Sequence, residues 1–143
     1  MLTLTTPITL LYAGMLGIVY GILVQRILVK RRQYRVSRYD GNVPELGARI
    51  RAHSNFAEYV PLLLLFLLLF ELNNLPPLLL HAFGLLLVLA RIYHAYGLIT
   101  AESTQSKNYR PRQRATFITM TLLISASLFA LIAALTAHTL AWL

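Results

Sequence analysis

The sequence contains no cysteine, few acidic residues and little charge of any kind. Without cysteine the chain can form no disulfide and offers no thiolate of its own, so any sulfur chemistry must come from a ligand. Charged residues make up only 13% of the 143 residues, whereas hydrophobic residues make up 57%. This composition is too apolar for a water-soluble domain of this size and is typical of an integral membrane protein.

Acidic residues are scarce beside basic ones: five Asp and Glu accompany thirteen Lys and Arg, which gives a formal net charge of +8. The basic residues flank apolar segments and match no nucleic-acid-binding motif, so we expect no nucleic-acid partner. The positive-inside rule explains them as cytoplasmic flanks of membrane helices. We therefore predict a multi-pass membrane protein with both basic loops in the cytoplasm and both termini on the opposite side.

Four long apolar stretches predict an all-α, membrane-embedded four-helix bundle that forms a single domain over residues 1–143. The helices are expected at about residues 5–28, 45–72, 76–97 and 112–142. The first stretch is not expected to be a cleaved signal, because Gln25 and Arg26 follow its apolar core in place of a small-residue cleavage site.

The second helix carries polar residues below the expected membrane surface. Its charge-free part, residues 59–70, is about 18 Å long and cannot cross a ~30 Å hydrocarbon core alone. Counting ~20 residues back from Leu72 reaches His53, which places Asn55 and Glu58 at membrane depth. Ionisable groups at that depth are costly, and they usually face a partner or a ligand.

Three polar residues of this helix share one face. Arg51, Asn55 and Glu58 are spaced at i, i+4 and i+7, and Tyr59 lies beside them. Such a group can hold a small zwitterionic ligand, with Arg binding a carboxylate and Glu binding an ammonium. The alternative is a salt-bridge network that only joins helices, and the spacing does not decide between the two.

The third helix ends in a second polar group that contains Arg91, His94 and Tyr96. Arg91 and Glu58 lie at a similar depth, about 8 Å from the cytoplasmic ends of their helices, so we expect these two side chains to pair. A lone Arg or His at a helix end is more often a membrane anchor, and that alternative stays open. The His and Tyr residues form no recognised ligand pattern, so we predict no metal site.

Arg114, at the start of the fourth helix, is the candidate for activating a bound thiol. A thiol with an ordinary pKa near 8.5 is mostly protonated at neutral pH, and making the thiolate the main form requires about 2.7 kcal/mol. One guanidinium at ~4 Å supplies about 4 kcal/mol at an effective dielectric of 20. A single well-placed arginine is therefore sufficient, although Arg110 and Arg112 fit a membrane-anchoring role better.

The stretch Glu45-Leu-x-x-Arg-Ile-Arg-Ala-His-x-Asn-x-x-Glu-Tyr-Val-Pro61 resembles the signature of the MAPEG family, the membrane-associated proteins in eicosanoid and glutathione metabolism. The likeness extends to the basic run that begins at Arg31, to Arg91 with His94, and to Arg114. The chain is most similar to the compact bacterial branch and to microsomal glutathione transferases. This resemblance implies a bacterial inner-membrane location.

The resemblance also implies a homotrimer that binds glutathione as a co-substrate between neighbouring subunits, in the cytoplasmic leaflet. Arg114 would be the catalytic residue that stabilises the glutathione thiolate. The residues that would bind glutathione, including those of the second and third helices, are Arg31, Arg32, Arg51, Asn55, Glu58, Tyr59, Arg91, His94 and Tyr96.

Two positions depart from the family pattern. Family members have an aromatic hydroxyl seven residues after the third-helix arginine, where this chain has Leu98. They also have a tyrosine four or five residues after the fourth-helix arginine, where this chain has Ile118 and Thr119. We expect a glutathione-dependent transferase or peroxidase that acts on lipophilic electrophiles or hydroperoxides from the membrane. The alternative is a non-catalytic member that binds a lipid or a partner protein.

Overall fold

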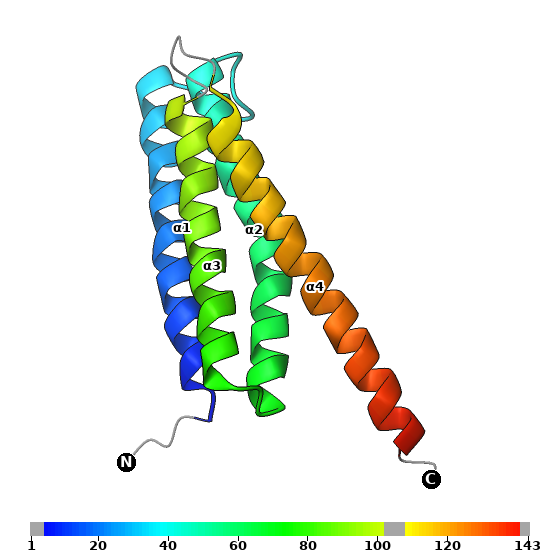
Figure 1. Ribbon diagram of the computed structural model, residues 1–143. Coiled ribbons are helices and arrows are strands. Elements are labelled where there is room, and N and C mark those ends of the chain that lie inside the picture. Colours follow the sequence, from blue (N-terminus) through cyan, green and yellow to red (C-terminus); the bar gives the residue numbers. More distant parts are fainter. Residues whose placement is uncertain (1–4, 102–107, 141–143) are drawn as a thin grey trace.

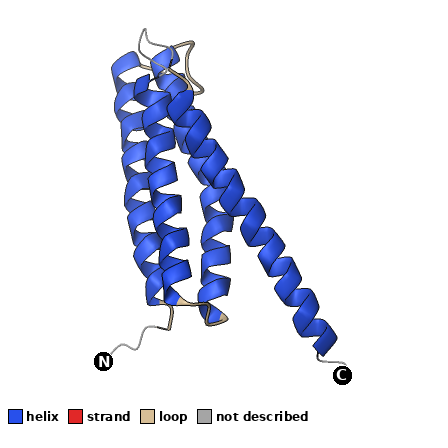
Figure 2. Ribbon diagram, viewed as in Figure 1, coloured by secondary structure: helices blue, strands red, loops and turns tan. Residues whose placement is uncertain are grey.

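The structure, a computed structural model, describes residues 5–101 and 108–140. Four long helices account for most of them: α1 (Pro7–Tyr34), α2 (Pro44–Leu72), α3 (Pro77–Tyr96) and α4 (Arg110–Leu140). A π-helical turn, η1 (Gly97–Ala101), follows α3 directly. The helices run antiparallel, so α1 begins and α4 ends at the same end of the bundle (Figure 1). No strand occurs in the described residues (Figure 2), which confirms the all-α prediction.

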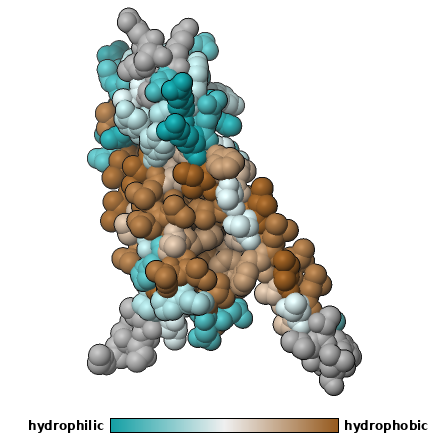
Figure 3. Space-filling view, in the orientation of Figure 1, coloured by the Kyte–Doolittle hydropathy of each residue, from teal (hydrophilic) through white to brown (hydrophobic). Residues whose placement is uncertain are grey.

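Each of the four helices is long and apolar enough to cross a membrane, which confirms the predicted four spans. An apolar band covers the middle of the bundle (Figure 3). Hydrophilic surface lies at the end where α1 ends and α4 begins. We call this end the basic end.

The predicted end of the first helix at residue 28 is wrong, because α1 continues to Tyr34. The run of charge after Lys30 ends the membrane span but not the helix, because Lys, Arg and Gln are good helix formers. The helix ends where Arg35 adopts φ 54°, and the backbone N–H of Val36 then bonds to the carbonyl of Arg31 at 3.0 Å. The fourth helix begins two residues earlier than predicted, at Arg110, and residues 141–142 of its predicted range lie outside the described residues.

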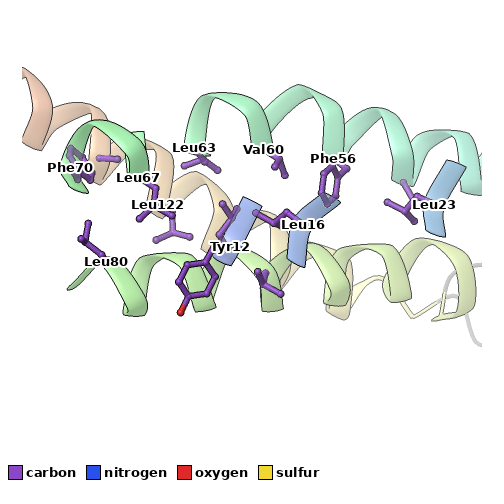
Figure 4. Close-up of a cluster of buried hydrophobic side chains, with 14 of the residues drawn as sticks. Tyr12, Leu16, Leu23, Phe56, Val60, Leu63, Leu67, Phe70, Leu80 and Leu122 are labelled. Carbon is purple, nitrogen blue, oxygen red and sulfur yellow. The ribbon is translucent and has the colours of Figure 1, made fainter. Parts of the chain in front are cut away.

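The core lies between α1, α2 and α3, and Leu122 of α4 joins the leucines of these three helices (Figure 4). Leu16, Leu63 and Leu87 are almost completely buried there. Helix α1 approaches α3 at Gly84, where an added Cβ would lie 2.2 Å from the ring of Tyr12. A glycine at this position therefore makes room for the tyrosine ring.

The end opposite the basic end is held together by polar contacts between helices. The carboxylate of Glu71, at the end of α2, accepts hydrogen bonds from the backbone N–H groups of Ile8 and Thr9 at 2.8 and 2.7 Å. These N–H groups belong to the first turn of α1 and would otherwise lack a partner. The hydroxyl of Tyr12 lies 3.1 Å from Nδ1 of His81 and donates to its carbonyl at 3.0 Å.

Helix α4 packs on its neighbours as far along as Phe129, whose ring centroid lies 5.2 Å from that of Phe70 on α2. Ala115, Thr119 and Ala126 are buried along its first half. The second half diverges from the bundle (Figure 1), and every residue from 131 to 138 is exposed. The site below is built where α4 still touches α2 and α3.

Candidate functional site

A hollow of about 530 Å³ opens between α2, α3, η1 and the start of α4, and we call it the ligand hollow. Its lining combines cationic, amide and hydroxyl side chains with two apolar ones: Arg51, Asn55, Tyr59, His94, Leu98, Arg112, Gln113, Thr116 and Phe117. Among the described residues of this lining there is no carboxylate. The hollow is therefore suited to an anionic or zwitterionic ligand rather than to a cation.

Arg51, Asn55 and Tyr59 come from successive turns of α2, as their spacing predicts, and all three line the hollow. Glu58 does not: its side chain is 47% exposed, and its Oε1 lies 4.0 Å from Nη1 of Arg51. An exposed pair at this distance is worth only about 0–1 kcal/mol. Glu58 therefore stands at the rim of the hollow, where it is available to a ligand.

Arg91 does not pair with Glu58, so that prediction is wrong. The Arg91 side chain is almost completely buried, and its Nη1 donates to Oδ1 of Asn55 at 2.8 Å. Its Nη2 donates to the hydroxyl of Thr119 on α4. The reason is orientation, because Asn55 faces α3 whereas Glu58, three residues later, points outward.

The buried guanidinium of Arg91 lies behind the wall of the hollow and not in its lining. Its charge lies 5.9 Å from the centre of the Tyr59 ring, and its Nε has no hydrogen-bond partner within the described part of the chain. A buried charge with neutral partners alone is costly. The Arg91 guanidinium fixes the orientation of Asn55 through its hydrogen bond and adds positive potential to the hollow.

The other residues predicted on the third helix point in different directions. His94 is buried and lines the hollow. Tyr96 is 51% exposed and stacks on Tyr93, with ring centroids 6.4 Å apart and planes 6° from parallel. Of these two residues, His94 joins Arg51 and Asn55 in the lining and Tyr96 does not.

The fourth helix contributes residues that the sequence analysis did not select. Arg112 and Thr116, one helical turn apart, line the hollow together with Gln113 and Phe117. Arg114 is exposed and lies outside the hollow, because two residues along a helix rotate a side chain by about 200°. Arg112 precedes Ala115 by three residues and Thr119 by seven, so it shares their helix face, and both of these residues are buried. This spacing is the signal that could have shown that Arg112, and not Arg114, faces α2 and α3.

The close approach of α4 to α3 depends on Gly97 in η1. A Cβ at Gly97 would lie 2.7 Å from the backbone nitrogen of Arg112. The π-helical turn also buries the Leu98 side chain, which separates the ligand hollow from a second hollow of about 760 Å³ at the basic end. Arg51 and Leu98 belong to the lining of both hollows, so they lie between the two.

The two predicted arginines at the end of α1 do not line the ligand hollow. Arg32 is exposed. Arg31 is half-buried, and its buried Nη1 finds no hydrogen-bond partner in the portions of the chain that the structure describes. Among the described residues, no three His, Asp or Glu side chains gather as a group able to hold a metal ion.

The sequence is similar to a known membrane-protein family and to bacterial inner-membrane proteins. The model of the MAPEG family matches residues 9–134. Inner membrane protein YecN of Escherichia coli K12 is 34% identical over 91 residues, which cover 58% of this chain and 70% of YecN. The protein of the same name from E. coli O6:H1, strain CFT073, gives the same values. The name of these relatives states a location and no reaction.

Proposed function

The chain belongs to the MAPEG family as a multi-pass inner-membrane protein, and we propose that it binds glutathione in the ligand hollow as a co-substrate. The observation that carries this proposal is the convergence of Arg51, His94 and Arg112 from three helices on one hollow. Glutathione has two carboxylates, and arginine binds carboxylates through paired hydrogen bonds. Its single ammonium has a partner in Glu58 at the rim.

Bound glutathione would react with a lipophilic molecule that arrives from the membrane. In a transferase reaction the thiolate forms a bond to an electrophilic carbon, and the leaving group departs with its electron pair. In a peroxidase reaction the thiolate attacks the terminal oxygen of a hydroperoxide and the O–O bond breaks, which leaves the sulfenic acid of glutathione and an alkoxide that takes up a proton to become an alcohol. The thiol of a second glutathione then attacks the sulfenic acid sulfur, which forms the disulfide and releases the oxygen as water. The exposed Phe117 gives the hollow an apolar side toward the lipid.

We assign the thiolate-stabilising role to Arg114, acting within a homotrimer. Because Arg114 is exposed and points away from the hollow of its own subunit, it would act on glutathione bound in the hollow of a neighbouring subunit. Two unpartnered surfaces support such an assembly: the exposed second half of α4, and the α1 face at Gly17 and Gly21, where the described residues leave open space. Glycines four residues apart allow close contact between membrane helices.

The test is glutathione titration of the purified protein in detergent, by calorimetry and by near-ultraviolet absorbance of the thiolate. We expect binding at millimolar glutathione or below, together with a thiolate signal at neutral pH. No binding at millimolar concentrations contradicts the proposal. Binding without a thiolate signal favours a non-catalytic lipid- or partner-binding member. The supporting observation is Leu98, an apolar side chain in the lining at the position where family members have an aromatic hydroxyl.

A further inference from the structure

A third hollow, of about 230 Å³, lies between α1 and α2 near the basic end and shares no residue with the ligand hollow. We call it the interfacial hollow. Its lining contains three basic side chains, one amide and two apolar side chains: Ile22, Gln25, Arg26, Val29, Lys30 and Arg49. Proposed glutathione contacts such as Arg51 and His94 line the other hollow, so this one needs a different explanation.

The basic side chains of the interfacial hollow exceed the acidic charge beside them. The carboxylate of Glu45 accepts from Nζ of Lys30 at 2.8 Å and from Nη2 of Arg49 at 2.9 Å. It also accepts the hydroxyl hydrogen of Tyr34 at 2.5 Å. One carboxylate therefore faces three cations when the exposed Arg26 is included, and an excess of two positive charges remains.

The lining changes from apolar to basic along α1, in the direction that leads out of the membrane. Residues 7–25 of α1 carry no charge and span about 28 Å, so a hydrocarbon core of ~30 Å ends close to Arg26. Ile22 then lies within the hydrocarbon, and Lys30 lies about 12 Å further along the axis, at headgroup level. Ile22 and Val29 are exposed large hydrophobic side chains.

We propose that the interfacial hollow binds a phospholipid with an anionic headgroup. The phosphate would lie among Arg26, Lys30 and Arg49, with Gln25 as a further donor, and the start of an acyl chain would cover Ile22. A free anion would use the basic side chains but would leave the apolar side chains uncovered. Basic pockets between membrane helices at headgroup level are suited to anionic lipids.

This site is independent of the proposed glutathione site. The carboxylate of Glu45 holds Lys30 and Arg49 in place on the α1 and α2 sides of the hollow before any lipid arrives. Such preorganisation favours one bound lipid over a diffuse cloud of exchanging lipids.

The experiment is native mass spectrometry of the full chain, purified in detergent and titrated with phosphatidylglycerol or with phosphatidylcholine. The test variant is the double substitution Arg26→Gln with Lys30→Gln, in which glutamine keeps a donor for Glu45. The matched control is Arg35→Gln with Arg38→Gln, which removes the same charge from residues that do not line the hollow. Glycerol phosphate serves as a soluble headgroup without acyl chains.

We expect phosphatidylglycerol to bind in preference to phosphatidylcholine and about thirtyfold more weakly to the test variant, because each of the two basic side chains near the surface contributes roughly fivefold. The control variant should bind as the unaltered chain does. An equal loss in both variants, equal binding of the two lipids, or full competition by glycerol phosphate overturns the proposal. Arg26→Gln alone breaks no contact named above, so a smaller loss of binding in this single variant checks that the result does not come from misfolding.

Discussion

The two ends of the bundle use polar side chains in opposite ways. At the end where α1 begins, the carboxylate of Glu71 accepts hydrogen bonds from the first turn of α1. The hydroxyl of Tyr12 on α1 bonds to His81 on α3. At the basic end, Arg51, Asn55 and Arg112 face an open hollow. Polar groups that only bond between helices stabilise the chain, whereas polar groups that also line a cavity at membrane depth can in addition contact a ligand. The contrast locates the proposed function at the basic end.

The largest effect is expected for Arg114→Ala, which should lower glutathione-dependent turnover by roughly a hundredfold and leave glutathione affinity largely intact. The physical reason is the loss of one charge that stabilises the thiolate, comparable in size to the loss of an electrostatic donor at an active site. Activity assays and calorimetry on the same preparation measure the two quantities.

Arg112→Ala is the matched control for that substitution, because Arg112 lines the ligand hollow two residues away. This variant should weaken glutathione binding. If Arg112→Ala removes turnover at saturating glutathione while Arg114→Ala does not, the catalytic role belongs to Arg112.

The second prediction concerns Arg91, the buried residue behind the hollow. Arg91→Met keeps most of the side-chain volume but removes the donors to Asn55 and Thr119. Glutathione affinity should fall about tenfold or more, because hydrogen bonds from a charged group contribute about 1.5–3 kcal/mol and Asn55 would lose its fixed orientation. Calorimetry measures the affinity. Unchanged affinity would show that Arg91 serves stability alone.

The third prediction tests the opposite end. Glu71→Ala should lower the free energy of unfolding by about 1–2 kcal/mol, because the N–H groups of Ile8 and Thr9 lose their acceptor. Thermal unfolding in detergent measures this loss, and Glu71→Gln, which keeps one acceptor oxygen, should recover part of it. Glutathione affinity should not change, and a clear change in affinity would remove the functional distinction between the two ends.

Much of the fold can be predicted from the sequence because the membrane constrains it. Only helices of about 20 residues satisfy the backbone inside the bilayer, so four apolar stretches give four spans. The end of α1 was missed because charge at Lys30 and beyond ends a span without ending a helix, and no residue before Arg35 breaks it. The spacing on α2 predicts Arg51, Asn55 and Glu58 on one face with Tyr59 beside it. Arg51, Asn55 and Tyr59 line the hollow, whereas Glu58 does not.

Contacts between helices were predicted less well. Depth arithmetic placed Arg91 beside Glu58, but depth does not give rotation about the helix axis, and the guanidinium bonds to Asn55 and Thr119 instead. Arg112 was missed for the same reason, because rotation about the α4 axis decides which arginine lines the hollow.

The sequence by itself determined that this protein spans the membrane four times, that it resembles the MAPEG family, and that Arg51 and Asn55 share one face of α2. These features depend on local chemistry: hydropathy, helical period and a contiguous motif. Only the tertiary structure decided which residues of α3, η1 and α4 meet that face, because this depends on how each helix is rotated and on the close approach at Gly97. Only the tertiary structure showed that Arg91 is buried behind the hollow, whereas Arg51 and Arg112 line it.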